Sequence, residues 1–172
     1  ELPAFVAAIH GRLYVRVNNY ENKAEDLYSY YLETGTMKVH AVTHLFDIVP
    51  YKEGKLLALR FDQSKTDPQT MQPLPPDLVA IDPETDEAEV LALPLPPPGK
   101  YGWVGNVPLW YQEQKDAVYL LQSGRLQVLD AGGPKEVAVL PADNWANPSS
   151  PAIVPYQDEL VFLMTGDNVF IR

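Results

Sequence analysis

Cysteine is absent from the 172 residues, and basic residues are few. Without thiols the chain has no disulfide, no thiol nucleophile and no thiolate metal site, although this absence does not fix the cellular compartment. The 13 Lys and Arg against 23 Asp and Glu give a formal net charge of −10, so the sequence lacks the basic surface that neutralises nucleic-acid phosphates. We therefore expect no nucleic-acid partner.

Long apolar runs are missing as well. No segment approaches the ~20 apolar residues that span a bilayer, so no membrane span is expected. The first four residues, Glu-Leu-Pro-Ala, contain neither a basic segment nor the apolar core of a signal peptide. If the protein is exported, its signal has been removed from this sequence.

Proline is the residue in excess. The chain has 17 prolines, about twice the usual ~5% share, while its 10 glycines are ordinary. Each proline inside a helix deletes a backbone donor and clashes with the preceding turn, so long helices are not expected. The 46% of apolar residues still suffice for a globular core, which short strands would then build.

An internal repeat defines the expected architecture. Residues 26–36, DLYSYYLETGT, match residues 77–87, DLVAIDPETDE, at an offset of 51. A third copy with a shorter turn is LQVLDAGGPKEVAVL, residues 126–140. Each copy is an apolar segment, a turn rich in Gly, Pro or Asp, and a second short segment, which predicts a β-hairpin.

A second element precedes each hairpin. The quartet IVPY occurs at residues 48–51 and again at 153–156, each time followed by a short apolar strand pattern, and residues 6–17 and 109–121 are weaker copies. One full repeat is therefore four strands in about 45 to 50 residues, which is typical of a β-propeller blade.

The predicted fold is all-β: a β-propeller or propeller fragment with about four blades of four antiparallel strands, the last incomplete. We place the blades at residues 5–42, 46–93, 107–140 and 152–172, in a single region that covers 1–172 and belongs to a longer chain or an assembly. The incomplete blade would leave a bare sheet edge at residues 169–171, so further blades of the same precursor or a second copy are the expected partners.

Two details of this fold can be checked directly. Residues 20–31 also show a helical stripe of Tyr, Ala and Leu, so an amphipathic helix is the alternative to the first hairpin. Two-sided burial between blades predicts that one residue of each second strand is buried near the axis; these are Val15, Leu57, Tyr119 and Phe162.

The hairpin LVAIDPETDEAEVLAL resembles the blade unit of the quinoprotein-like and surface-layer-like propeller families, in which an apolar strand is followed by Asp-Pro-x-Thr-Gly. Asp86 stands where those families usually have glycine, and Gly35 keeps it in the first copy. Residues 46–60, the proline-rich residues 72–76 and residues 82–85 are similar to the propeller region of extracellular solute-binding lipoproteins of gut Clostridia-type bacteria. This resemblance implies an exported, lipid-anchored system, but no quinone, because the tryptophan-docking motifs of quinoproteins are not recognisable.

Aromatic residues in loops are the best binding candidates. In propellers the connections between blades share one face with the loops between second and third strands, such as residues 62–77. Tryptophans beside Asn and Asp on such a rim could stack on sugar rings or anchor a peptide, or they could simply fill gaps between blades. The candidate ligand-binding residues are Tyr20, Tyr101, Trp103, Trp110, Asn144 and Trp145.

Metal binding and nucleophilic catalysis have little support in the sequence. His40 and His44 would pair on a helix, but on an outer strand their spacing does not converge, and His10 fits a surface turn. Asp82, Glu84 and Asp86 resemble a calcium loop, yet turn formation explains them more simply. Neither a G-x-S-x-G motif nor a serine near a histidine in sequence is present, so Ser and His could meet only in space. No metal, cofactor or catalytic residue is expected.

These observations favour a non-enzymatic recognition or scaffold domain of an exported solute-binding system, located outside the cell or at its surface. Its ligand would be a carbohydrate, a peptide or a protein, bound at the aromatic loop face. The alternative is a glycan-active hydrolase or lyase whose catalytic groups come from loops or from blades outside this chain. A pair of carboxylates directed into a funnel would favour the enzyme.

Overall fold

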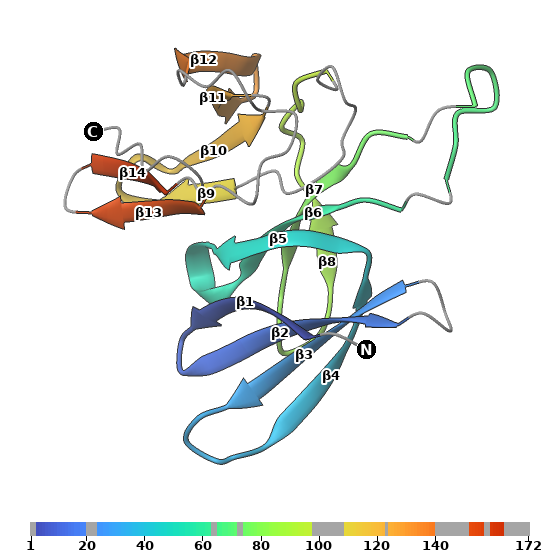
Figure 1. Cartoon of the computed structure of the whole chain (residues 1–172), viewed down its shortest axis with the longest axis vertical. Helices are drawn as coiled ribbons and strands as arrows, with labels where there is room; N and C mark the ends of the chain where they lie inside the picture. Colours follow the sequence, from blue (N-terminus) through green and yellow to red (C-terminus); the bar gives the residue numbers. More distant parts are fainter. Residues whose placement is uncertain are drawn as a thin grey trace. The chain divides into compact units, whose positions relative to one another are not determined.

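The structure is a computed structural model that describes residues 3–19, 24–62, 65–71, 74–97, 109–122, 124–139, 152–156 and 159–163 (Figure 1). Among these residues it has strands and two short 3₁₀ turns, η1 and η2, and no α-helix. The chain divides into two compact units, Glu1–Ala92 and Leu93–Arg172. The predicted all-β class is confirmed.

The first unit holds two four-stranded antiparallel sheets, each with its strands in sequence order. The first sheet consists of β1 (Pro3–Ile9), β2 (Arg12–Asn19), β3 (Ala24–Tyr31) and β4 (Met37–Thr43). The second sheet consists of β5 (Leu45–Pro50), β6 (Leu56–Arg60), β7 (Asp77–Ile81) and β8 (Ala88–Val90), with η1 (Lys52–Gly54) between β5 and β6.

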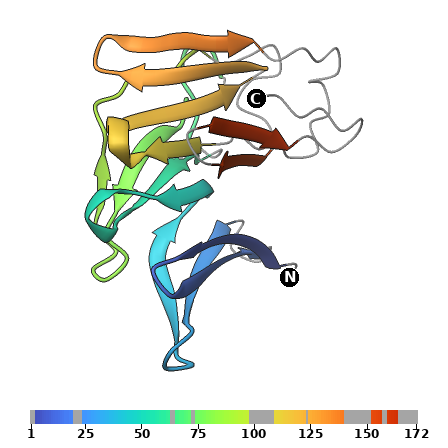
Figure 2. The same ribbon diagram turned by 90° about the vertical axis from the view of Figure 1, so that its left-hand side faces the viewer.

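The second unit holds the third sheet, which is antiparallel throughout (Figure 2, yellow to orange). Its strands are β9 (Leu109–Gln112), β10 (Ala117–Gln122), β11 (Arg125–Asp130) and β12 (Gly133–Val139), with η2 (Glu113–Lys115) between β9 and β10. The two-stranded sheet of β13 (Ala152–Tyr156) and β14 (Glu159–Leu163) follows. Residues 164–172, and with them the expected bare edge at 169–171, lie outside the described residues.

The three four-stranded sheets begin and end within a few residues of the first three predicted repeats, and β13 and β14 lie in the fourth. Closure of these sheets into a ring, and the grouping of residues 1–172 in a single propeller region, stay predictions. Proline is compatible with these strands because Pro3, Pro50 and Pro134 all lie in edge strands. On an edge strand the backbone N–H can face away from the neighbouring strand, so its absence in proline removes no hydrogen bond between strands.

The 51-residue repeat reappears as a repeated hydrogen-bond pattern. In the β3–β4 turn the Tyr31 N–H donates to the Thr36 carbonyl (2.8 Å) and the Gly35 N–H to the Tyr31 carbonyl (2.9 Å). In the β7–β8 turn the residues 51 positions later, Asp82, Glu87 and Asp86, make the same two bonds at 2.9 and 2.8 Å. Both turns need a left-handed residue, which is Gly35 (φ 68°) in the first and Asp86 (φ 63°) in the second.

The helical alternative at residues 20–31 is wrong over the part that is described, because β3 pairs with β2 on one side and β4 on the other. Residues 20–23 lie outside the described residues. Cross-strand pairing of Tyr28 and Tyr30 with apolar partners on both neighbouring strands outweighs the local helical periodicity. The equivalent residues at the starts of the third strands, Leu27, Leu78 and Leu126, are all buried.

The core of the first unit lies between its two sheets. It gathers apolar side chains from the two facing surfaces, which are Ile9, Tyr14, Leu27, Val42, Leu45, Ile48, Leu56, Ala58, Val79 and Ile81. In β6 four successive residues are buried, so both faces of the second sheet are covered. This is the pattern expected for strands packed on both sides.

The prediction that one named residue of each second strand is buried is confirmed for one of the four residues. All four lie on the second strands β2, β6, β10 and β14, and Leu57 is fully buried. Val15 and Tyr119 are only half-buried. Val15 lies on the face of the first sheet that is turned away from the core, and the Tyr119 hydroxyl donates to the Gln112 side chain (3.3 Å). In β2 the buried residue is the neighbouring Tyr14. The side chain of Phe162 lies outside the described residues.

Candidate functional site

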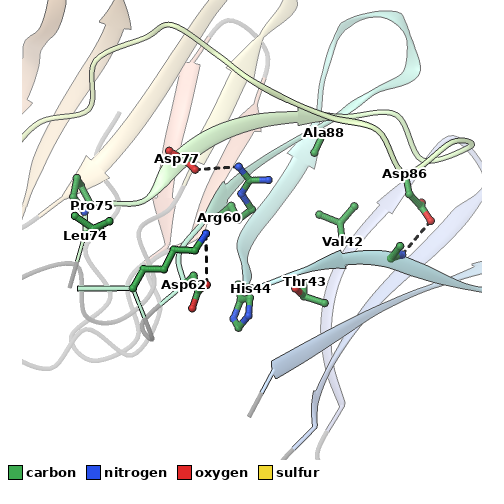
Figure 3. A pocket seen from close by; sticks show the side chains of 12 residues that line it. Val42, Thr43, His44, Arg60, Asp62, Leu74, Pro75, Asp77, Asp86 and Ala88 are labelled. Carbon is green, nitrogen blue, oxygen red and sulfur yellow. Dashed lines mark hydrogen bonds and ion pairs between the residues drawn. The ribbon is translucent and has the colours of Figure 1, made fainter. Parts of the chain in front are cut away.

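A pocket of about 650 Å³ opens in the first unit, between the two sheets and the long loop of the second sheet (Figure 3). Its wall combines charged, polar and small apolar side chains, and in Figure 3 Leu74 and Pro75 lie at one end and Asp86 at the other. The lining residues are Ala41, Val42, Thr43, His44, Arg60, Asp62, Lys65, Leu74, Pro75, Asp77, Asp86 and Ala88.

Two connections build most of this pocket. The first joins the sheets: β4 ends at Thr43 and β5 starts at Leu45, so His44 alone (φ 61°) turns the chain. The second is the loop between β6 and β7, whose ends are tied by a bond from the Leu74 N–H to the Lys65 carbonyl (3.0 Å). Within that loop the Asp67 carboxylate accepts the backbone N–H groups of Gln69 (2.7 Å) and Thr70 (3.1 Å), so it forms a turn. Connections of these two kinds were expected to share one face.

Two ion pairs face the pocket. Arg60 Nη2 lies 3.0 Å from Asp77 Oδ2, and Lys65 Nζ lies 3.7 Å from Asp62 Oδ2 (Figure 3). All four side chains are partly exposed, and exposed pairs contribute little to stability, about 0–1 kcal/mol each. Arg60, Asp77 and Lys65 can therefore exchange these pairings for contacts with a polar ligand at small cost.

At the other end of the pocket the Asp86 carboxylate joins the two sheets. It accepts hydrogen bonds from three groups of β4: His40 Nδ1 (2.6 Å), Lys38 Nζ (3.1 Å) and the Ala41 N–H (3.1 Å). Burial alone would raise the pKa of Asp86, but these three donors lower it below the ordinary value. The carboxylate is thus ionised at neutral pH, so His40 Nδ1 carries the proton of the shared hydrogen bond. Asp86 holds the β7–β8 turn against β4.

His40 continues this chain of hydrogen bonds inwards. Its Nε2 lies 2.8 Å from Ser29 Oγ, so Ser29, His40 and Asp86 form the donor and acceptor sequence of a Ser-His-Asp hydrolase. Ser29 is 0% exposed, however, and no substrate can reach its hydroxyl in this structure. The arrangement therefore stabilises the packing of the sheets and gives no support to nucleophilic hydrolysis.

The same turn is held by further contacts from the first sheet. Lys38 Nζ donates to the carbonyls of Pro83 (2.7 Å) and Glu84 (2.8 Å), and Arg12 forms an ion pair with Glu84. Asp82 caps its own turn by accepting the N–H of Glu84 (2.8 Å). The acidic residues of this loop are thus used in turn formation and sheet contacts, and no group of three metal-ligating side chains occurs among the described residues.

Of the six residues predicted to bind ligand, the structure describes Trp110. It lies half-buried on β9 with its ring centroid 5.3 Å from that of Tyr119, so it packs within the third sheet. Tyr20, Tyr101, Trp103, Asn144 and Trp145 lie outside the described residues. Whether the aromatic loops bind a ligand stays a prediction.

The histidines have separate positions. His10 is exposed in the β1–β2 turn, as predicted, while His40 is buried and His44 lines the pocket. Sequence reasoning missed the pairing of His40 with Asp86 and the pocket role of Arg60 and Asp77. The one available signal was Asp86 itself, because a non-glycine residue in a left-handed turn position often has a side-chain reason to be there.

No family model matches the chain, and no curated protein matches it. Among solved structures, the chain is similar to the extracellular domain of a putative one-component system from B. thetaiotaomicron, with 14% sequence identity and a TM-score of 0.44. The match covers 77% of this chain and 16% of that one. In the described residues no helix is long and apolar enough to cross a membrane.

Proposed function

We propose that this chain is part of a β-propeller that acts, without catalysis, as a ligand-recognition module outside the cell. The pocket bounded by the β4–β5 connection and the β6–β7 loop is the observation that carries the proposal. The repeated hairpins support the propeller architecture, and the sequence resemblance to extracellular propeller regions supports the location. Ring closure and export are parts of the proposal.

The chemistry of the pocket favours an uncharged, hydroxyl-rich ligand such as an oligosaccharide. Arg60 and Lys65 supply donors, Asp62 and Asp77 supply acceptors, and the paired charges nearly cancel. A hydroxyl group can donate to the carboxylate and accept from the cation of one pair at once. Leu74 and Pro75 add a small apolar surface for the carbon face of a sugar ring.

Isothermal titration with a panel of neutral oligosaccharides tests this proposal, with short peptides as the competing ligand class. We expect binding of at least one oligosaccharide, and a loss of ten-fold or more in affinity in both Arg60→Ala and Asp77→Ala. Arg125→Ala is the matched control, since Arg125 forms a comparable exposed ion pair with Glu136 in the third sheet and does not line the pocket. Equal affinities in all variants, or binding of peptides alone, would contradict the proposal.

A glycan hydrolase is the second candidate, because Asp62 and Asp77 place two carboxylates in the same pocket. A reducing-sugar assay on the oligosaccharides that bind separates the two functions. Recognition predicts no release of reducing ends. Hydrolysis that is lost in both Asp62→Asn and Asp77→Asn would establish the enzyme instead.

A further inference from the structure

The first sheet has one covered face and one open apolar face. The covered face carries Tyr14, Leu27, Ser29 and His40, which are all buried. The open face carries residues of the opposite parity on the same strands. Tyr30, Met37 and Val39 there are 42%, 67% and 57% exposed.

The open face is continuous across three strands. Leu13 of β2 lies opposite Tyr30 of β3, which lies opposite Met37 of β4. The next row pairs Val15, Tyr28 and Val39 in the same order. Two adjacent rows of apolar side chains therefore lie in contact with water, which is unusual for a sheet that packs tightly on its other face.

The repeat shows what covers this face in the second sheet. The residues 51 positions after Tyr28 and Tyr30 are Val79 and Ile81, and their partners on β6 are Ala58 and Leu56. All four are 0% exposed and belong to the core formed against the first sheet. The face that is open in the first sheet is thus the face by which the second sheet packs on its predecessor.

The polar contacts at this interface repeat in the same way. The β7–β8 turn offers the Glu84 carboxylate to Arg12 and the carbonyls of Pro83 and Glu84 to Lys38. In the β3–β4 turn the equivalent residues are Glu33 for Glu84 and Leu32 for Pro83. Both are exposed, and Glu33 forms no ion pair with another described residue.

We propose that the open face of the first sheet, formed by Leu13, Val15, Tyr28, Tyr30, Met37 and Val39, docks a further four-stranded sheet of the same repeat carried by the same polypeptide. That sheet would present a mostly apolar face to it, as the first sheet presents Ile9, Tyr14, Leu27 and Val42 to the second sheet. It would also carry basic residues at the positions of Arg12 and Lys38, which would bind Glu33 and the backbone carbonyls of the β3–β4 turn. None of these six residues lines the pocket, so the proposal rests on the repeat architecture of the proposed function and does not depend on the pocket's ligand.

A sheet from the same polypeptide is favoured because the observed interface joins consecutive sheets. The second sheet is covered by the sheet that precedes it in the chain, and one residue, His44, links the two. The same short connection would hold a further sheet at high effective concentration beside the first.

A tandem chain tests the proposal, with the first sheet itself as the added sheet. This sheet is chosen because its covered face already packs on the second sheet. Residues 1–44 are joined directly to residue 3 of a second, otherwise complete copy, which reproduces the native link between β4 and β5. That copy carries Gly35→Asp, so that His40 of the added sheet meets the carboxylate that Asp86 supplies to the native His40. We expect the thermal midpoint of the first unit to rise by roughly 5 °C or more over that of the 172-residue chain with the same Gly35→Asp substitution, because a formerly open face is covered. Tyr30→Lys in the complete copy should abolish this rise and should leave the 172-residue chain unchanged.

Controls separate docking from a general surface effect. Val137→Lys should be neutral in both chains, because Val137 is a similarly exposed residue on the outer strand β12. Glu33→Arg in the complete copy should lower the midpoint of the tandem chain alone, and Arg12→Glu in the added sheet should restore part of it. If the tandem chain fails to fold, nitration of tyrosine decides: Tyr30 should be modified in the 172-residue chain and protected in the polypeptide that carries the proposed sheet.

Two results would overturn the proposal. The first is an unchanged midpoint in a folded tandem chain or, if that chain does not fold, equal nitration of Tyr30 in the 172-residue chain and in the polypeptide that carries the proposed sheet. The second is a dimer of the 172-residue chain in light scattering that Tyr30→Lys converts to a monomer, because a second copy would then be the occupant of this face.

Discussion

Asp86 offers the sharpest test of how the two sheets of the first unit are held together. Its carboxylate accepts bonds from His40, Lys38 and the Ala41 N–H, and its backbone is left-handed with φ 63°. Replacement by glycine removes the carboxylate and relieves the backbone, since the equivalent residue of the first hairpin is Gly35. Asp86→Gly therefore isolates the contribution of the side chain.

The magnitude follows from the three bonds. Leaving the buried His40 Nδ1–H without a partner costs about 1–3 kcal/mol, and the bonds from Lys38 and Ala41 contribute about 0.5–1.5 kcal/mol each. Relief of the left-handed backbone returns about 1 kcal/mol. The expected net loss in free energy of unfolding is about 3 kcal/mol, which lowers the midpoint of a unit of this size by more than about 10 °C. Asp86→Ala should lose about 1 kcal/mol more, because alanine keeps the backbone strain.

Thermal and urea unfolding followed by circular dichroism measure these losses. Glu87→Ala is the control, because Glu87 is an exposed carboxylate of the same turn, and its effect should stay within about 0.5 kcal/mol. If Asp86→Gly unfolds at the same temperature as the Glu87→Ala control, the cross-sheet bonds contribute no net stability and the reasoning is wrong.

Three further predictions concern pH, a turn and the core. Because its hydrogen-bond donors lower the pKa of Asp86 below the ordinary 3.8, its stabilisation should be present above pH 3.8 and lost as the pH falls through the folded value; urea titrations from pH 6 to 2 should show this loss reduced in Asp86→Gly. Gly35→Ala should cost about 1–2 kcal/mol in urea unfolding, since Gly35 has φ 68°, and a neutral result would show that the turn relaxes. Leu57→Ala should cost about 2–5 kcal/mol because Leu57 is fully buried, whereas Val39→Ala on the open face should change stability by less than about 0.5 kcal/mol; similar losses in both would contradict the assigned burial.

The hairpins could be predicted from the sequence because they depend on neighbouring residues. The Asp82 turn is closed by bonds within residues 82–87, and the Gly35 turn by bonds within residues 31–36. Such turns need only local chemistry, so a repeated motif at a fixed offset identifies them. The all-β class and the four-stranded unit followed from counting these elements.

Which side chains become a core or a site could not be predicted in the same way. Periodicity placed Val15 and Tyr119 correctly on second strands, but it could not tell whether a neighbouring sheet covers their face. The register of the packed sheets decides this, and a shift of one residue exchanges the two faces of a strand.

The sequence by itself therefore determined the strands, the turns and the repeat, because short-range hydrogen bonding and alternation suffice for them. Tertiary structure alone decided that Asp86 meets His40, 46 residues earlier, and that Arg60 and Asp77 face one pocket with His44. These contacts join sheets, or the two ends of a loop. Their energies depend on burial and distance, which exist only after the sheets have packed.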